Sequence, residues 1–161
     1  MKTLKQLGIA SLILLSFPVL ANGQHWKFNE NSGSGYVGAS TDISKSIWIL
    51  PNETAHYKDS VRFTLSQISD GICTWQHEQE KRVLKVNKKL VKFTYAGCQN
   101  VSTSNSIVSF IPSTNKGNHY ILNQFEKKTA VSIDGNNYSA IGFIDTQKKV
   151  IAREKAEENA L

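Results

Sequence analysis

Residues 81–95, with the sequence KRVLKVNKKLVKFTY, contain two short β-type runs separated by a polar turn. Val83–Val86 and Leu90–Tyr95 supply the β-branched and aromatic residues that are typical of strands, and Asn87-Lys88-Lys89 separates them. Because paired residues of a hairpin lie equally far from its turn, a turn centred between Asn87 and Lys88 sets Val86 opposite Lys89. The stretch therefore predicts a hairpin, and with it an antiparallel sheet.

Similar short runs lie on both sides of this hairpin. Val61, Phe63 and Leu65 alternate with polar residues, the period of two that indicates a strand with one face in water. Asp134-Gly135-Asn136-Asn137 is a strong turn signal, since Gly and Asn tolerate positive φ. The remaining runs are Ile47–Leu50, Ile72–Trp75, Ile107–Ile111, Thr129–Asp134 and Tyr138–Ile144. We expect an antiparallel sheet of about six to eight short strands, connected as hairpins and a meander.

Two segments change to the helical period. In residues 114–128, Ile121 and Phe125 are four apart with Leu122 beside them, and Ser113 or Thr114 can act as the N-cap. Asp145 can cap a second helix over residues 146–158, which has little apolar surface and ends in two glutamates, the unfavourable sign for a helix C-terminus. The sequence therefore predicts an α+β domain with one inserted helix and one peripheral C-terminal helix.

Residues 1–21 have the three parts of a cleaved signal peptide. Lys2 and Lys5 precede an apolar run, Leu7–Leu20, and the small residue Ala21 offers a cleavage point. A membrane anchor needs about 20 apolar residues, whereas this run has 14 and contains Pro18. We therefore expect a bacterial-type exported protein, periplasmic or secreted, without a membrane span. Its mature chain, residues 22–161, has the size of a single domain.

The first mature segment, residues 22–45, is polar and rich in glycine. Its Asn31-Ser32-Gly33-Ser34-Gly35 run favours a loop over a regular element. Trp26 and Tyr36 lie in this segment, where a loop would leave their rings accessible. Both are candidate partner-binding residues, and a role as lids that cover the sheet is an equal alternative.

Cys73 and Cys98 are the only cysteines of the chain. An oxidising compartment favours a disulfide between them, and no C-x-x-C spacing supports a metal pair or a redox dithiol. The two cysteines are four residues out of register with the 81–95 hairpin, so His77-Glu78-Gln79-Glu80 is expected to form a loop or bulge. A disulfide that closes the loop from Cys73 to Cys98 stabilises the fold by about 3 kcal/mol on the chain-entropy model.

The sequence contains neither a nucleophile-elbow motif nor a metal-binding motif. No serine lies in G-x-S-x-G, the four histidines share no motif, and neither H-x-x-x-H nor an acidic calcium loop occurs. The sequence therefore predicts no catalytic residue, no metal site and no cofactor, and favours a protein without enzymatic activity. Because a triad can assemble from distant residues, a small envelope hydrolase stays an alternative.

The 81–95 hairpin also carries a basic cluster without an acid: Lys81, Arg82, Lys85, Lys88, Lys89 and Lys92. One interpretation is a solvated hairpin whose lysines keep a strand edge from pairing with other chains. The other is a binding surface for an envelope or host protein or an anionic envelope polymer. Export makes nucleic acid an unexpected partner, and removal of Lys2 and Lys5 lowers the formal net charge from +6 to a mild +4.

Ser32-Gly33-Ser34-Gly35-Tyr36 resembles the S-G-x-x-Y loop of periplasmic inhibitors of C-type lysozyme, which are small exported β proteins. The resemblance covers five residues, and the Tyr-x-Cys element of that family is missing ahead of the loop. It implies inhibition of a lysozyme-like enzyme as one alternative function. The leading hypothesis is a non-enzymatic binding or accessory protein of the periplasm or cell envelope.

Overall fold

The computed structural model describes residues 24–51, 61–74 and 80–160 of the chain. The expected signal peptide, residues 1–21, lies outside these ranges. The described strands are β1 (Lys27–Asn29), β2 (Ser34–Gly38), β3 (Lys45–Pro51), β4 (Val61–Asp70), β5 (Lys81–Val86), β6 (Lys89–Asn100), β7 (Asn105–Pro112), β8 (Ala130–Ile133) and β9 (Asn136–Ser139). The helices are α1 (Asn115–Lys127) and α2 (Phe143–Glu158).

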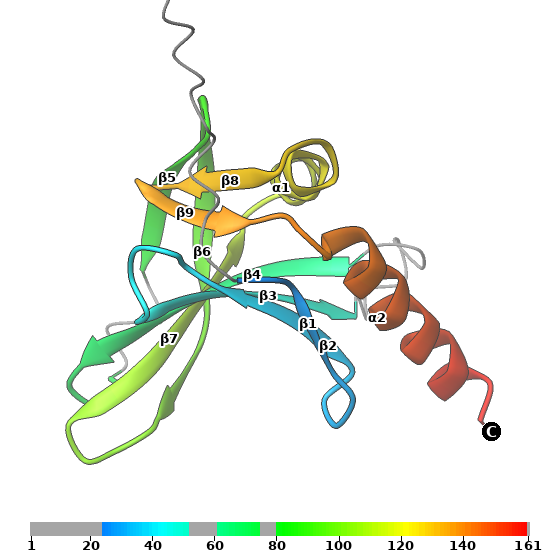
Figure 1. Cartoon of the computed structure of the whole chain (residues 1–161). Helices are drawn as coiled ribbons and strands as arrows, with labels where there is room; N and C mark the ends of the chain where they lie inside the picture. The colour runs from blue at the N-terminus through cyan, green and yellow to red at the C-terminus, as the bar shows by residue number, and fades with distance from the viewer. Residues whose placement is uncertain (1–23, 52–60, 75–79, 161) are drawn as a thin grey trace, which may run out of the picture.

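All of these strands belong to one antiparallel sheet, in the order β1-β2-β3-β4-β7-β6-β5-β8-β9. The sheet curls into a half-barrel (Figure 1), and its two ends approach each other. Ala39, directly after β2, forms an isolated bridge with Tyr138 of β9, and the Ser40 N–H donates to the Asn137 carbonyl at 2.9 Å. The α+β class is confirmed, but nine strands in the described residues exceed the expected six to eight.

The β5–β6 hairpin has the predicted register. Val86 pairs with Lys89, and the ladder continues to Lys81 and Thr94. Asn87 takes a positive φ of 51° in the turn. The second predicted turn also forms, with β8 and β9 joined at Asp134 and Gly135, both at positive φ.

The extra strands come from residues 22–45, where a loop was predicted. β1 and β2 form a hairpin, and its glycines have specific tasks: Gly33 has a φ of +64°, and Gly35 packs against α2 and β3. A Cβ on Gly35 would overlap Thr146 and come within 2.8 Å of the Ile49 Cγ1. The glycine-rich composition therefore serves a turn and a close approach rather than a loop.

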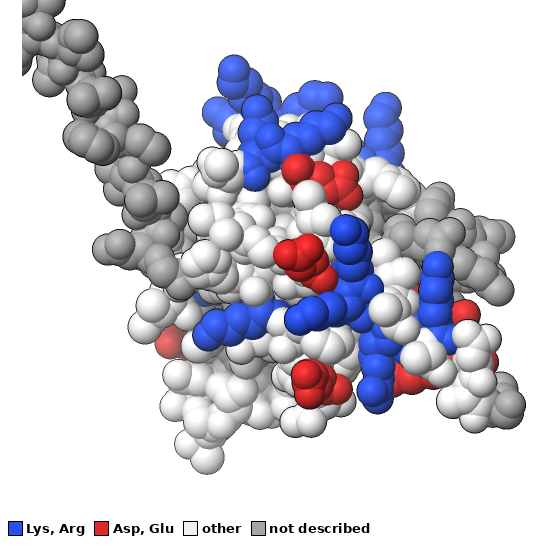
Figure 2. Space-filling view, turned by 45° about the vertical axis from the view of Figure 1, so that its right-hand side comes forward, with Lys and Arg blue, Asp and Glu red and all other residues white. Residues whose placement is uncertain are grey.

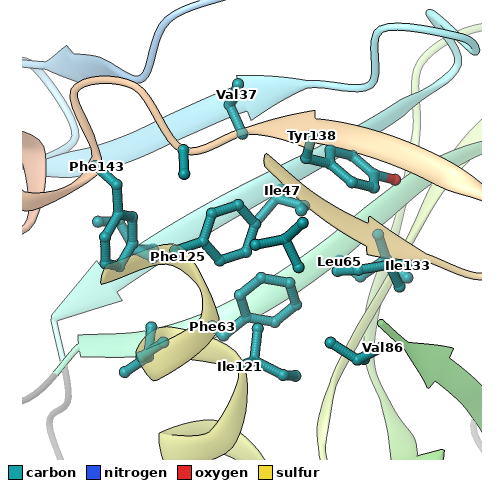
Figure 3. Close-up of a cluster of buried hydrophobic side chains, with 14 of the residues drawn as sticks. Val37, Ile47, Phe63, Leu65, Val86, Ile121, Phe125, Ile133, Tyr138 and Phe143 are labelled. Carbon is teal, nitrogen blue, oxygen red and sulfur yellow. The ribbon is translucent and has the colours of Figure 1, made fainter. Parts of the chain in front are cut away.

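The core lies inside the curled sheet and is closed by α1. Thr114 caps α1 as predicted, accepting a hydrogen bond from the Gly117 N–H at 3.1 Å. Ile121, Leu122 and Phe125 of this helix are buried, and Figure 3 shows Ile121 and Phe125 directed at Phe63.

Helix α2 starts three residues earlier than predicted. Its N-cap is Gly142 at a φ of 81°, and Asp145 lies in the first turn rather than at the cap. Phe143 is fully buried, which gives the start of α2 an anchor in the core. The C-terminal end of α2 lies away from the sheet, as expected for a peripheral helix (Figure 1). No helix within the described ranges is long and apolar enough to cross a membrane.

The predicted disulfide forms between Cys73 and Cys98, whose Cα atoms are 5.7 Å apart. Its setting differs from the expected meander. Residues 72–74 form no strand, and β7 lies between β4 and β6, so the bond links the segment after β4 to the second strand beyond it. The described irregularity of β6 is a bulge between Tyr95 and Gly97, while residues 77–79 of the expected loop lie outside the described ranges.

Candidate functional site

Five of the six predicted basic side chains are exposed on the β5–β6 hairpin: Lys81, Lys85, Lys88, Lys89 and Lys92. The strands alternate, so Lys85 faces solvent opposite Leu90, and Lys92 does so opposite Val83. Leu90 is 73 % exposed and Val83 is 55 % exposed. The hairpin thus presents positive charge and apolar surface together.

Arg82 is the exception among these residues. Its side chain hydrogen-bonds Glu80 and donates to the Gln67 Oε1 at 2.9 Å. Its guanidinium also lies 4.1 Å from the centre of the Phe110 ring. Arg82 therefore stabilises the sheet from a half-buried position and is not part of the exposed basic surface.

Helix α1 brings further lysines to the same place. One hollow of about 280 Å³ lies between the start of β6 and the start of α1, with Lys89, Lys92 and Lys116 in its lining. A second, of about 750 Å³, adjoins it through Lys89 and Tyr120 and is lined by Lys88 and Lys128. Figure 2 shows basic side chains gathered at the top of the molecule, the level at which Figure 1 draws the hairpin tip and α1. We call Lys88, Lys89, Lys92, Lys116 and Lys128 the basic face.

Hydrogen bonds hold the hairpin tip against α1 and β8. The Asn87 amide donates to the Gln124 Oε1 at 2.9 Å and accepts from the Ser132 N–H at 3.0 Å. The Tyr120 hydroxyl donates to the Val86 carbonyl at 3.2 Å. The Lys89 Nζ lies 5.0 Å from the centre of the Tyr120 ring, within the range of a cation–π contact. The two elements therefore present their lysines in a fixed relation.

The basic face has no acid in the described lining of its two hollows. None of its five lysines forms a salt bridge within the described part of the chain. The first turn of α1 contains Lys116 and no acid, which opposes the helix dipole at a cost of about 0.3–1 kcal/mol. A charge arrangement that destabilises the element that carries it is typical of a functional surface.

The sequence analysis missed the contribution of α1. Lys116, Tyr120 and Gln124 follow one another at intervals of four, which places them on one face of the helix, and Lys128 is the C-cap residue of that helix. That spacing was visible in the sequence. The proximity of this helix face to the hairpin was not visible, because the contact of Asn87 with Gln124 joins residues 37 apart in the sequence.

The two aromatic candidates have different positions. Trp26 is 5 % exposed, stacks edge-on against Phe125 and Phe143, and donates its indole N–H to the Ser139 carbonyl at 2.9 Å. It is a core residue, so its assignment as an accessible binding residue is corrected. Tyr36 is half-buried on β2 and stacks on Trp48, with ring centres 4.9 Å apart.

The inhibitor-like segment lies partly within the sheet. Ser34, Gly35 and Tyr36 belong to β2, and Ser34 is 1 % exposed. Ser32 is exposed, and it lies with Gly33 in the turn between β1 and β2.

Catalytic groupings are also not found in the described residues. His25 and His119 are exposed, while His56 and His77 lie outside the described ranges. No group of three His, Cys, Asp or Glu side chains within those ranges could hold a metal ion. Burial, and then the charge of Asp42, raises the pKa of the Tyr138 phenol, and hydrogen bonds from Ser44 and Lys45 lower the pKa of Asp42. Both shifts reinforce the ordinary charge state of each group, which does not suit proton transfer.

Comparison of the chain with protein-family models, curated proteins and solved structures gives no significant match. The functional argument therefore rests on the geometry of the basic face.

Proposed function

We propose that this chain is an exported, non-enzymatic binding protein of the bacterial cell envelope, and that the basic face binds an anionic partner. The observation that carries the proposal is the convergence of five exposed lysines from the β5–β6 hairpin and α1 around two adjoining hollows, with no salt bridge to a described residue. The disulfide supports an oxidising compartment, since such bonds persist outside the cytosol.

The composition of the face supports a partner with both charge and apolar surface. Lysines provide long-range attraction and orientation, which raise association rates more than they raise final affinity. Leu90 and the Tyr120 ring lie among them and provide area that is removed from water on contact. An acidic protein surface or an anionic envelope polymer has the matching charge.

Charge reversal on two regions of the protein tests this proposal. Lys89→Glu, Lys92→Glu and Lys116→Glu alter the basic face, whereas Lys148→Glu, Lys149→Glu and Lys155→Glu alter α2 by the same change in net charge. All six side chains are exposed, so neither triple variant removes core packing. Circular dichroism of both variants checks that the fold is kept.

Binding to fluorescently labelled poly-L-glutamate is measured by anisotropy. The basic-face variant is expected to bind at least about tenfold more weakly than the native chain, and the α2 variant within about threefold of it. Equal weakening by the two variants would mean that binding follows net charge alone, and the proposal would be wrong.

A further inference from the structure

Another hollow lies on the outer surface of the curled sheet, and none of its lining residues belongs to the basic face. Its volume is about 540 Å³, and it is lined by Leu50, Arg62, Thr64, Tyr95, Ala96, Gly97, Cys98, Gln99, Ile107, Ser109 and Ile111. The alternation of β7 explains its floor, because Phe110 and Val108 point into the core while Ile107, Ser109 and Ile111 point outward. The bulge between Tyr95 and Gly97 interrupts the β6–β7 ladder at the same place.

Two β4 side chains that line this hollow contain buried polar atoms with no hydrogen-bond partner among the described residues. They are the Thr64 Oγ1, on a residue that is 6 % exposed, and the Arg62 Nε. The next outward residue on β4, Ser66, is equally buried but shares a hydrogen bond of 2.8 Å with the Ser109 hydroxyl. A buried polar group that lacks its hydrogen bond destabilises a protein. A valine at position 64 would avoid that cost, so the hydroxyl points to a hydrogen-bond partner outside the described residues.

The remaining lining residues indicate what kind of molecule would satisfy these atoms. An arginine side chain offers only donors, and a threonine hydroxyl can also donate, so their common complement is an acceptor such as a carboxylate. Leu50, Ile107 and Ile111 give the same hollow an apolar wall. No acidic residue is among its described lining residues.

Acids do lie on the other side of Arg62. A neighbouring hollow of about 480 Å³ shares Leu50 and Arg62 with the first, and its lining contains Glu154, Glu157 and Glu158 of α2. Glu157 is paired with Arg153. These carboxylates line only the second hollow, whereas Thr64 lines only the first and Arg62 lines both.

We propose that the hollow at Arg62 and Thr64 binds a small carboxylic acid with a short apolar chain. The carboxylate accepts hydrogen bonds from Arg62 and Thr64, and the chain packs on Leu50, Ile107 and Ile111. The carboxylate gives both polar atoms a hydrogen-bond partner, and the apolar wall excludes water from the contact.

The test uses hexanoate as the probe, with hexan-1-ol and hexylamine as matched molecules of the same length. Each is titrated into the full chain and followed by ¹H–¹⁵N correlation spectra. Hexanoate is expected to shift the amide signals of Thr64 and Gly97 with a Kd on the order of 1 mM, the affinity reached by ligands of this size. The alcohol and the amine are expected to bind at least about tenfold more weakly, because neither has a charged acceptor.

Two variants assign the contacts. Arg62→Gln is expected to weaken hexanoate binding at least about tenfold. Thr64→Val keeps the side-chain shape, so it is expected to weaken binding about threefold while raising the melting temperature, since it removes an unpaired buried hydroxyl. Thr94→Val, at a half-buried hydroxyl that is hydrogen-bonded to Ser113, is the control and should leave hexanoate binding unchanged.

Three results would overturn the proposal. One is the absence of shifts at Thr64 and Gly97 with hexanoate. Another is equal affinity for hexanoate and hexan-1-ol, which would indicate a simple apolar depression. The third is a lower melting temperature of Thr64→Val, which would show that the hydroxyl already has a partner, such as an ordered water.

Discussion

The basic face and helix α2 contain the same kinds of exposed cation but arrange them differently. Helix α2 carries four basic and four acidic residues in one continuous segment, and Arg153 pairs with Glu157 one turn later. The basic face collects five lysines from two elements, and the described residues of its hollows include no acid. Both regions contain exposed lysines, yet only one of them concentrates positive charge.

This difference in charge arrangement distinguishes a surface that keeps the protein soluble from a surface that recognises a partner. Interspersed charges of both signs keep a surface soluble and attract no particular partner. A surface of one sign, held in place by hydrogen bonds between separate elements, produces a local potential that selects partners by their charge. The lysine content of a segment is therefore a poorer guide to function than the acids that surround it.

The largest effect is expected from truncating Phe125, the side chain that anchors α1 in the core. Phe125 is 1 % exposed and contacts Trp26, Phe63 and Phe143, so Phe125→Ala should lower the free energy of unfolding by about 3–5 kcal/mol. Chemical denaturation measures this change. At temperatures where the variant stays folded, poly-L-glutamate binding should weaken because Lys116 and Lys128 lose their fixed position. The matched change on α2, Val150→Ala, should cost less stability and leave binding intact.

A smaller effect is expected at the hairpin turn. Asn87→Ala removes the hydrogen bonds to Gln124 and Ser132 and puts a non-glycine residue without a polar side chain at a φ of 51°. We expect a loss of about 2 kcal/mol in denaturation experiments. Asn87→Gly restores the backbone freedom and should recover part of that loss. If both variants are as stable as the native chain, the turn does not hold the hairpin tip to α1.

The apolar part of the basic face should contribute about 1 kcal/mol to binding. Leu90 is 73 % exposed, so Leu90→Ser should leave stability nearly unchanged and weaken poly-L-glutamate binding about fivefold if a partner covers it. Ile144→Ser on α2, at a side chain 46 % exposed, is the control and should leave affinity unchanged. If the native chain, Leu90→Ser and Ile144→Ser all bind poly-L-glutamate equally well, the basic face binds through charge alone.

The smallest effect is expected from the ion pair of α2. Arg153 and Glu157 are exposed and one turn apart, so Glu157→Gln should lower stability by about 0.3–0.5 kcal/mol at low salt. Binding to poly-L-glutamate should not weaken, because the variant removes an acid remote from the basic face. A marked loss of binding would mean that α2 takes part in recognition.

Local features of the fold were predictable from the sequence. The register of β5 and β6 follows from the turn at Asn87, the β8–β9 hairpin from Asp134-Gly135, and the start of α1 from Thr114. The cysteine pair followed from chemistry rather than position. Each of these signals acts within a few residues or requires only that two thiols find each other.

Non-local features were not predictable. The need for glycine at position 35 comes from Ile49 and Thr146, and the burial of Trp26 comes from α1 and α2. Three of the five lysines of the basic face were found, because the hairpin lysines lie close together in the sequence. The lysines of α1 were missed because only folding brings them to the hairpin, and Thr64 was indistinguishable from any polar residue of an alternating strand.

The dependence of poly-L-glutamate affinity on salt tests the central claim most directly. Each lysine that neutralises a polyanion charge releases a counterion and adds nearly one unit to the slope of log Kd against log[NaCl]. The native chain and the Lys148→Glu, Lys149→Glu, Lys155→Glu variant should share a slope of about 3–4. The Lys89→Glu, Lys92→Glu, Lys116→Glu variant should lose most of that slope. Equal slopes for the two variants would contradict a localised basic face and leave only the net charge of the chain.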